Sequence, residues 1–346
     1  MTCPRNRMTS FFPAELNAAS GLSPLLVPGR TDDGWSAVVP GGSRWHDRRM
    51  EADAADPCAP HPPTRETGQV RSLTVRAADG RSLHALTQGE GDHLVVLEAG
   101  LGAGGASWAG VLDLLGPEVR AVAYDRAGYG GSDRVRGPRD LAALSADLLA
   151  VVDAVPDDRL VLVGHSWGGP IVRHAAQQLA DRGREVRGVL LVDPAEELAD
   201  LYFTPLARGM NRAQGVALPV LARLGLLAPL QRAAVSGLPE ALRAEAAASV
   251  STLGAAFAVA EESRHMTRGL QSLRLDPPPP LPGAVSVISG RRPEGLGRRM
   301  RDELTAAHRA RADRELGRFL PAEQSGHVVG ASQPELIAGE IERLLR

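Results

Sequence analysis

Residues Leu160-Val161-Leu162-Val163-Gly164-His165-Ser166-Trp167-Gly168-Gly169 form the most informative segment of this chain. The first four residues are an uninterrupted apolar run, which is typical of a strand covered on both faces. Glycines flank Ser166 at positions 164 and 168, where a larger side chain would crowd a sharp turn. Helical spacing then continues to about Asp181. The segment therefore predicts a buried strand, a tight turn that presents Ser166, and a helix whose N-terminus favours developing negative charge.

Short apolar strands alternate with helical patterns on both sides of this segment. Two alternating runs, 70–77 and 81–87, flank the turn signal Asp79-Gly80 and predict a hairpin. Further strands are expected at 94–98, 119–124, 189–192, 285–289 and 319–323, and helices at 141–155, 298–314 and from residue 333 onward. Strands that alternate with helices in this way predict an α/β fold with a doubly wound, mostly parallel sheet.

The pattern also divides the chain into parts of different character. Residues 1–68 contain Pro, Gly, Arg and Asp without any period, and we expect a disordered or extended N-terminal segment in which Met50 is a candidate true start. Residues 69–346 are the predicted folded domain. Within them, residues 196–278 have helical patterns only, which predicts a helical cap inserted over the carboxyl ends of the strands, where such sheets bind ligands.

Composition excludes several classes of function. The chain has 346 residues with 39 basic side chains, all arginine, against 41 acidic ones, for a net charge of −2. This balance argues against nucleic-acid binding through a general basic surface, and the absence of lysine excludes Schiff-base and P-loop lysine mechanisms. Two cysteines, Cys3 and Cys58, form neither a disulfide framework nor a metal-ligand cluster. No apolar run is long enough for a signal peptide or a membrane span. We expect a cytoplasmic protein that acts on a small molecule without metal or cofactor, and we leave its oligomeric state open.

A nucleophilic serine needs a base, and His327 is the candidate with the right place in the chain. When the serine lies on a strand-to-helix turn, chain order places the histidine last. His327 lies in Ser325-Gly326-His327, a loop before the final helix, whereas His308 lies in a charged helix and is expected to be solvated. The neighbouring arginines from Arg291 to Arg318 are likewise interpreted as a solvated helical face.

The acid that orients the histidine has two candidates. Asp193 ends the strand after the serine-bearing helix, and Glu294 follows a later strand. We favour Asp193, because its shorter side chain at the end of a buried strand is better fixed, although an aspartate before Pro194 could instead cap a turn.

Two backbone N–H groups are needed near the serine to hold an oxyanion. One is expected from Trp167, which follows the serine, and the other from Leu101 in the glycine-rich loop 99–105. The same loop also fits a dinucleotide fingerprint, Gly100-x-Gly102-x-x-Gly105, with Asp125 about 20 residues on as the ribose-binding acid. This alternative leaves Ser166 unexplained, and a hairpin precedes the strand where a dinucleotide domain would open.

Taken in order, these blocks resemble the α/β-hydrolase superfamily in its serine-hydrolase branch, from about residue 70 to 346. The blocks are 98–102, 107–108, 124–133, 164–169, 191–194 and 325–327, followed by Pro334-Glu335. The resemblance implies a Ser166 nucleophile, a His327 base and an oxyanion hole from Leu101 and Trp167. The chain departs from the family in two places: the loop begins Ala99-Gly100 instead of His-Gly, and 291–293 replace the usual aspartate after the penultimate strand. The predicted function is hydrolysis of an ester-like or other acyl bond through an acyl-enzyme. The alternatives are a non-hydrolytic ligand-binding or lyase-type member of the fold, and a dinucleotide-binding protein.

Overall fold

The computed structural model describes residues 70–134, 137–155, 159–227, 251–293 and 297–346. The predicted N-terminal segment, with Met50 and both cysteines, therefore lies outside the described residues. Glu294, the alternative acid, also lies outside them, as does the middle of the predicted insertion. The bounds 1–68, 69–346 and 196–278 remain predictions.

A single eight-stranded sheet forms the centre of the described chain, in the order β1-β2-β4-β3-β5-β6-β7-β8. The first two strands form the predicted hairpin, β2 pairs antiparallel with β4, and every other pairing is parallel. The mostly parallel α/β fold is thereby confirmed. The strands are β1 Arg71–Arg76, β2 Ser82–Gln88, β3 His93–Glu98, β4 Val119–Tyr124, β5 Arg159–His165, β6 Gly188–Val192, β7 Ala284–Gly290 and β8 Arg318–Ala322.

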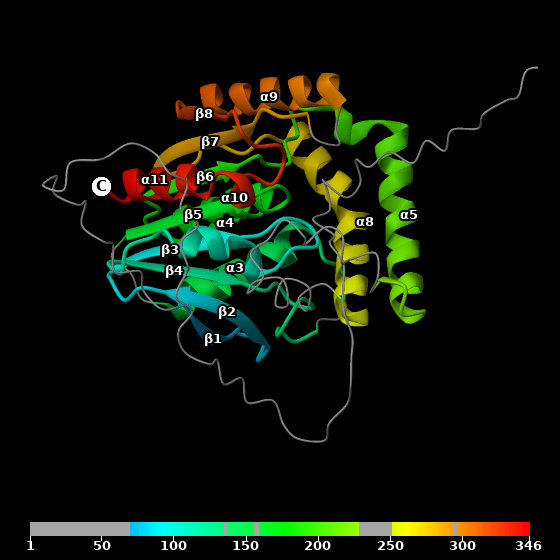
Figure 1. The fold of residues 1–346 in the computed structure, drawn as a ribbon, viewed down its shortest axis with the longest axis horizontal. Helices are drawn as coiled ribbons and strands as arrows, with labels where there is room; N and C mark the ends of the chain where they lie inside the picture. The colour runs from blue at the N-terminus through cyan, green and yellow to red at the C-terminus, as the bar shows by residue number, and fades with distance from the viewer. Residues whose placement is uncertain (1–69, 135–136, 156–158, 228–250, 294–296) are drawn as a thin grey trace, which may run out of the picture.

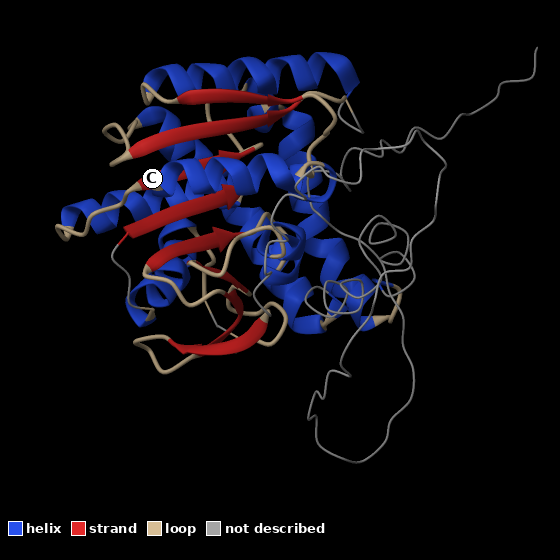
Figure 2. Cartoon of the chain, turned by 60° about the vertical axis from the view of Figure 1, so that its left-hand side comes forward, coloured by secondary structure: helices blue, strands red, loops and turns tan. Residues whose placement is uncertain are grey.

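Helices cover both faces of the sheet, as Figures 1 and 2 show. Alternate residues of each central strand enter different cores, because side chains of a strand point to opposite faces. Leu160 and Leu162 of β5 belong to the cluster that contains the buried apolar residues of 141–155 and 171–179, while Val161 and Val163 belong to the cluster that contains those of 111–115 and 337–345. The helices are η1 Gly105–Trp108, α2 Ala109–Leu112, α3 Leu141–Ala154, α4 Gly168–Asp181, η2 Asp200–Phe203, α5 Pro205–Arg223, α8 Leu253–Leu275, α9 Gly297–Arg314, α10 Val329–Ser332 and α11 Pro334–Leu345.

Helices α5 and α8 pack against each other beyond the carboxyl ends of the parallel strands (Figure 1). Each begins at a threonine whose hydroxyl caps the first turn, Thr204 for α5 and Thr252 for α8. Helix α8 lies nearer the sheet: a Cβ atom on Gly269 would sit 3.1 Å from the indole of Trp167, the residue that follows Ser166. These two helices therefore border the end of the sheet where the glycine-rich turns gather.

Candidate active site

The turn between β5 and α4 presents Ser166 in a strained backbone conformation. Its φ angle is +53°, in the left-handed region that residues with a side chain rarely adopt. The flanking glycines permit this turn by close packing. A Cβ atom on Gly164 would lie 2.5 Å from the carbonyl oxygen of Gly168, and one on Gly168 would lie 2.5 Å from that of Glu98. The predicted need for glycine at both positions thus has a direct steric cause.

The structure brings Ser166, His327 and Asp193 together at the carboxyl ends of the strands. The Nε2 atom of His327 lies 3.0 Å from the Oγ atom of Ser166, and its Nδ1 atom lies 2.7 Å from the Oδ2 atom of Asp193. All three residues are buried. This order of contacts suits a neutral imidazole that donates from Nδ1 to the carboxylate and accepts the serine proton at Nε2.

Asp193 is held on its other oxygen by donors from two further elements. Its Oδ1 atom accepts hydrogen bonds from the N–H of Gly290 at 2.9 Å and from Nη1 of Arg301 at 2.7 Å. Burial raises the pKa of this carboxyl, but the hydrogen bond from His327 and the charges of His327, His308 and Arg301 outweigh it, so the pKa lies below its usual range. Asp193 also has a positive φ of +42°. The carboxylate is therefore ionised and fixed at the end of β6.

The interpretation of the arginine-rich helix as a solvated face is wrong for its inner side. Arg301, His308 and Arg311 of α9 are buried, because acids near the end of β6 provide their partners. Arg311 pairs with Glu196, and His308 donates from Nε2 to the carbonyl of Pro194 at 2.8 Å. A spacing of three or four residues on α9 places Arg301, Leu304, His308 and Ala312 on one face, and this spacing was the signal available in the sequence.

Leu101 and Trp167, the two predicted oxyanion donors, lie close to Ser166. Neither Leu101 nor Trp167 donates a backbone hydrogen bond to any residue that the structure describes. Such groups are rarely left unpaired when buried, and both residues are buried. The loop of Leu101 approaches Ser166 closely, because a Cβ atom on Gly100 would lie 3.6 Å from the Oγ atom of Ser166. Two backbone N–H groups next to a serine are the kind of donor set that an oxyanion hole requires.

His165 is a site neighbour that the sequence reasoning did not single out. Its Nε2 atom donates to the carbonyl oxygen of His327 at 2.9 Å, and the two imidazole rings lie 4.9 Å apart. Burial, followed by the charge of His327, lowers the pKa of His165 to about 4. The neutral ring of His165 therefore supports the backbone of the histidine loop and adds no charge beside the base at neutral pH.

Asp125, the acid of the dinucleotide alternative, is engaged within the protein. Its Oδ1 atom accepts from the N–H of Gly105 at 2.9 Å, and its Oδ2 atom lies 3.0 Å from Nδ1 of His84. Gly105 itself packs against β4, because a Cβ atom there would lie 2.6 Å from the carbonyl oxygen of Ala123. Loop-to-strand packing thus accounts for Gly105, the last glycine of the spacing that resembles a phosphate-binding loop.

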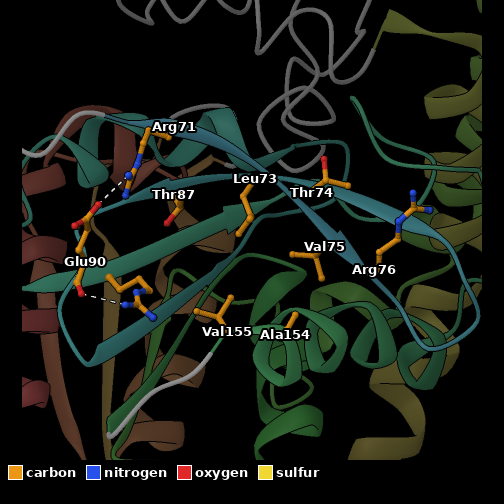
Figure 3. Close-up of a pocket in the computed structure, with 11 residues that line it drawn as sticks. Arg71, Leu73, Thr74, Val75, Arg76, Thr87, Glu90, Ala154 and Val155 are labelled. Atoms are coloured by element: carbon orange, nitrogen blue, oxygen red, sulfur yellow. Dashed lines mark hydrogen bonds and ion pairs between the residues drawn. The ribbon is translucent and has the colours of Figure 1, made fainter.

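A surface hollow lies at the edge of the sheet that ends with β1 (Figure 3). It borders β1, the end of β2 and the end of α3, and its lining includes an exposed ion pair of 2.8 Å between Arg71 and Glu90. Its lining residues include no serine, histidine or cysteine. Elsewhere in the described ranges, no cluster of three or more His, Cys, Asp or Glu residues is arranged to hold a metal ion.

The chain belongs to the alpha/beta hydrolase family, whose model matches residues 94–340. An AB hydrolase superfamily protein of Gibberella zeae is 25% identical in an alignment of length 286 that covers 73% of this chain and 86% of that protein. Epoxide hydrolase A of Mycobacterium tuberculosis is 36% identical over 115 residues, 32% of this chain and 36% of that protein.

Solved structures give the same fold. A thermophilic esterase from Thermogutta terrifontis matches with a TM-score of 0.59 and 21% identity, covering 80% of this chain and 98% of the esterase. The epoxide hydrolase CorEH matches with a TM-score of 0.57 and 17% identity, covering 80% of this chain and 98% of that enzyme. The resemblance to the α/β-hydrolase superfamily is confirmed, and the named relatives hydrolyse more than one kind of bond.

Proposed function

We propose that this protein is a serine hydrolase that cleaves an ester or another acyl bond of a small molecule through an acyl-enzyme. The observation that carries the proposal is the unbroken, buried hydrogen-bonded series from Ser166 through His327 to Asp193, with distances of 3.0 and 2.7 Å. A serine hydroxyl alone is a weak nucleophile, and a histidine held by a carboxylate activates it by accepting its proton.

In the first half of the reaction, the Oγ atom of Ser166 attacks the substrate carbonyl carbon while Nε2 of His327 takes the hydroxyl proton. The carbonyl oxygen becomes an oxyanion, which the N–H groups of Leu101 and Trp167 stabilise. The ionised Asp193 stabilises the imidazolium. When the tetrahedral intermediate collapses, the bond to the leaving group breaks and His327 delivers its proton to that group.

In the second half, water attacks the acyl carbon of the ester on Ser166. His327 takes a proton from this water and returns it to the serine oxygen, and the free acid leaves. The cycle needs no group beyond water and the side chains named, and it restores every residue to its starting protonation state.

The identity of residue 166 favours acyl substrates over epoxides. Attack of a serine oxygen on an epoxide carbon would leave a dialkyl ether on the protein, and water does not cleave an ether by addition to a carbonyl. Attack on an ester leaves an ester, which the same base can hydrolyse. The partial match to an epoxide hydrolase therefore supports the shared fold more than a shared substrate.

Substitution of Ser166 by alanine tests the proposal. We expect wild type to hydrolyse p-nitrophenyl butyrate and to react with a fluorophosphonate probe at Ser166, and we expect S166A to lose both while unfolding at a similar temperature. Retained turnover in S166A would refute the mechanism. A folded wild type that neither turns over esters nor reacts with the probe would favour the ligand-binding or lyase-type alternative.

Two further observations concern membrane spans and access to the site. Across the described residues, no helix combines the length and apolar character that a bilayer crossing requires. Helix α8 packs against Trp167, the residue after Ser166, and α5 packs against α8, so both helices would limit the size of what enters. A role of these helices as a cap and a cytoplasmic location remain predictions.

A further inference from the structure

Helix α8 contacts the side chains that hold both candidate oxyanion donors in place, although it lies about 100 residues or more further along the chain. Glu262 reaches the loop of Leu101 through Arg126, and Gly269 lies against the indole of Trp167. We infer that α8 positions the oxyanion hole, so that the inserted helix sets the rate of the chemical step as well as access to the site. This inference rests on the proposed serine hydrolase function.

The first contact is a buried ion cluster. Arg126 donates to both carboxylate oxygens of Glu262, at 3.1 Å from Nε and 2.8 Å from Nη2, and it also pairs with Glu98. All three side chains are buried. Bidentate arginine–carboxylate pairs fix geometry as well as charge, and removal of one partner leaves an uncompensated buried charge. Glu262 therefore holds the plane of the Arg126 guanidinium.

The same guanidinium holds the loop beside the serine. Its Nη1 atom donates to the carbonyl oxygen of Ala99 at 2.7 Å, and its Nη2 atom donates to that of Gly100 at 2.9 Å. The carbonyl of Gly100 and the N–H of Leu101 belong to one planar trans peptide and point in opposite directions. A hydrogen bond that fixes the carbonyl therefore also fixes the direction of the Leu101 N–H.

The second contact supports the other donor. The side chain of Trp167 is fully buried, and a Cβ atom on Gly269 would lie 3.1 Å from its ring. Positions 262 and 269 are separated by about two helical turns, so both lie on the face of α8 that is directed at the site. A displacement of α8 would thus disturb Leu101 and Trp167 together.

Two variants test this role independently. Glu262→Gln keeps the shape of the side chain and removes its charge, and Gly269→Ala adds one methyl group against Trp167. The matched control for E262Q is Glu340→Gln, because Glu340 is a buried acid on α11 that pairs with Arg318 and Arg343. The matched control for G269A is Gly209→Ala on α5, where a Cβ atom would meet nothing within 4 Å.

For p-nitrophenyl butyrate we expect kcat to fall about tenfold or more in E262Q and G269A, because loss of one oxyanion donor costs about 10²–10³ in kcat. We expect KM to change far less, and the affinity for a boronic acid transition-state analogue to fall in parallel with kcat/KM.

Values of kcat in both variants within twofold of those in E340Q and G209A would overturn the inference. If wild type reacts neither with the ester nor with the fluorophosphonate probe, the proposed function fails, and this inference fails with it. Since G269A leaves the ion cluster intact, misfolding of E262Q alone does not remove the test.

Discussion

The Nη1 atom of Arg301 lies 2.7 Å from the Oδ1 atom of Asp193, on the carboxylate oxygen opposite the one that contacts His327. The same nitrogen is 3.2 Å from the carbonyl oxygen of Gly290. The Nε and Nη2 atoms of Arg301 are buried and have no hydrogen-bond partner among the described residues. Burial of the Arg301 guanidinium thus costs desolvation free energy, and the charge that it supplies neutralises and orients the carboxylate of Asp193.

Replacement of Arg301 by methionine should lower both stability and turnover. The change leaves the charge of Asp193 buried without its cation, and breaking a buried pair costs about 3–5 kcal/mol of unfolding free energy. It should also raise the pKa of Asp193 and weaken its hold on His327, so we expect kcat to fall at least tenfold, which corresponds to about 1.4 kcal/mol. Urea unfolding and ester kinetics measure the two effects. Arg299→Met, an exposed position on the same helix, should change neither, and an equal loss there would argue against a specific role.

The identity of the acid can be tested by comparing Asp193→Asn with Glu294→Gln. Asparagine at 193 would present an amide N–H to His327 and favour the wrong tautomer, so we expect kcat to fall by about 10⁴. Glu294→Gln should leave kcat within about twofold of wild type if Asp193 is the acid. The reverse ranking of the two variants would reassign the acid to Glu294.

The packing of the serine turn predicts a steric cost at Gly168. A Cβ atom there would lie 2.5 Å from the carbonyl oxygen of Glu98, so Gly168→Ala should destabilise the protein by about 1–3 kcal/mol. Gly339→Ala in α11, where a Cβ atom meets nothing within 4 Å, should instead stabilise it by about 0.5–1 kcal/mol. Thermal unfolding of both variants compares them. An equal shift in Tm would mean that the turn relaxes without cost.

The buried carboxyl of Glu98 should make the unfolding free energy of the protein depend on pH. Burial, opposed in part by the charge of Arg126 and the hydrogen bond from Tyr124, raises the pKa of Glu98 to about 7. The folded state therefore binds the proton of the Glu98 carboxyl more tightly than the unfolded state does. The stabilisation that results is fully present below pH 4.5, the ordinary pKa of a glutamate, and is lost as the pH rises through about 7. The unfolding free energy of wild type relative to Glu98→Gln should fall as pH increases from about 4.5 to 7. A difference that stays constant over this range, measured by urea unfolding, would contradict the assignment.

Much of the architecture was predictable because local patterns determine it. The apolar runs at 94–98, 119–124 and 189–192 each became a buried strand, and the Asp79-Gly80 turn joined the expected hairpin. The serine turn, the late histidine and Asp193 also came together as the chain order had suggested. These features depend on residues that lie close in sequence, or on the fixed order of strands in a parallel sheet.

The missed features depend on partners that are distant in sequence. Arg301 lies in a strongly polar helix and Glu262 in a mixed one, and their partners Asp193 and Arg126 lie more than 100 residues away. Glu262 shares a helix face with Val259, Met266 and Leu270, which is the spacing of a buried stripe. A charged residue on such a stripe indicates a buried counter-charge, but sequence spacing cannot tell which residue supplies it.

The loop of Leu101, the turn of Ser166 and Asp193 follow β3, β5 and β6, which are neighbours in the sheet. Adjacent strands lie about 4.8 Å apart, so the distance between strands sets the separation of these three groups across the sheet. A slip of one residue between β5 and β6 would turn the acid toward the opposite face. The sheet therefore spaces Ser166 and Asp193, the proposed nucleophile and acid, independently of α5 and α8, whose proposed roles are charge stabilisation and access. Family members could diversify in substrate through those helices without respacing the reacting groups.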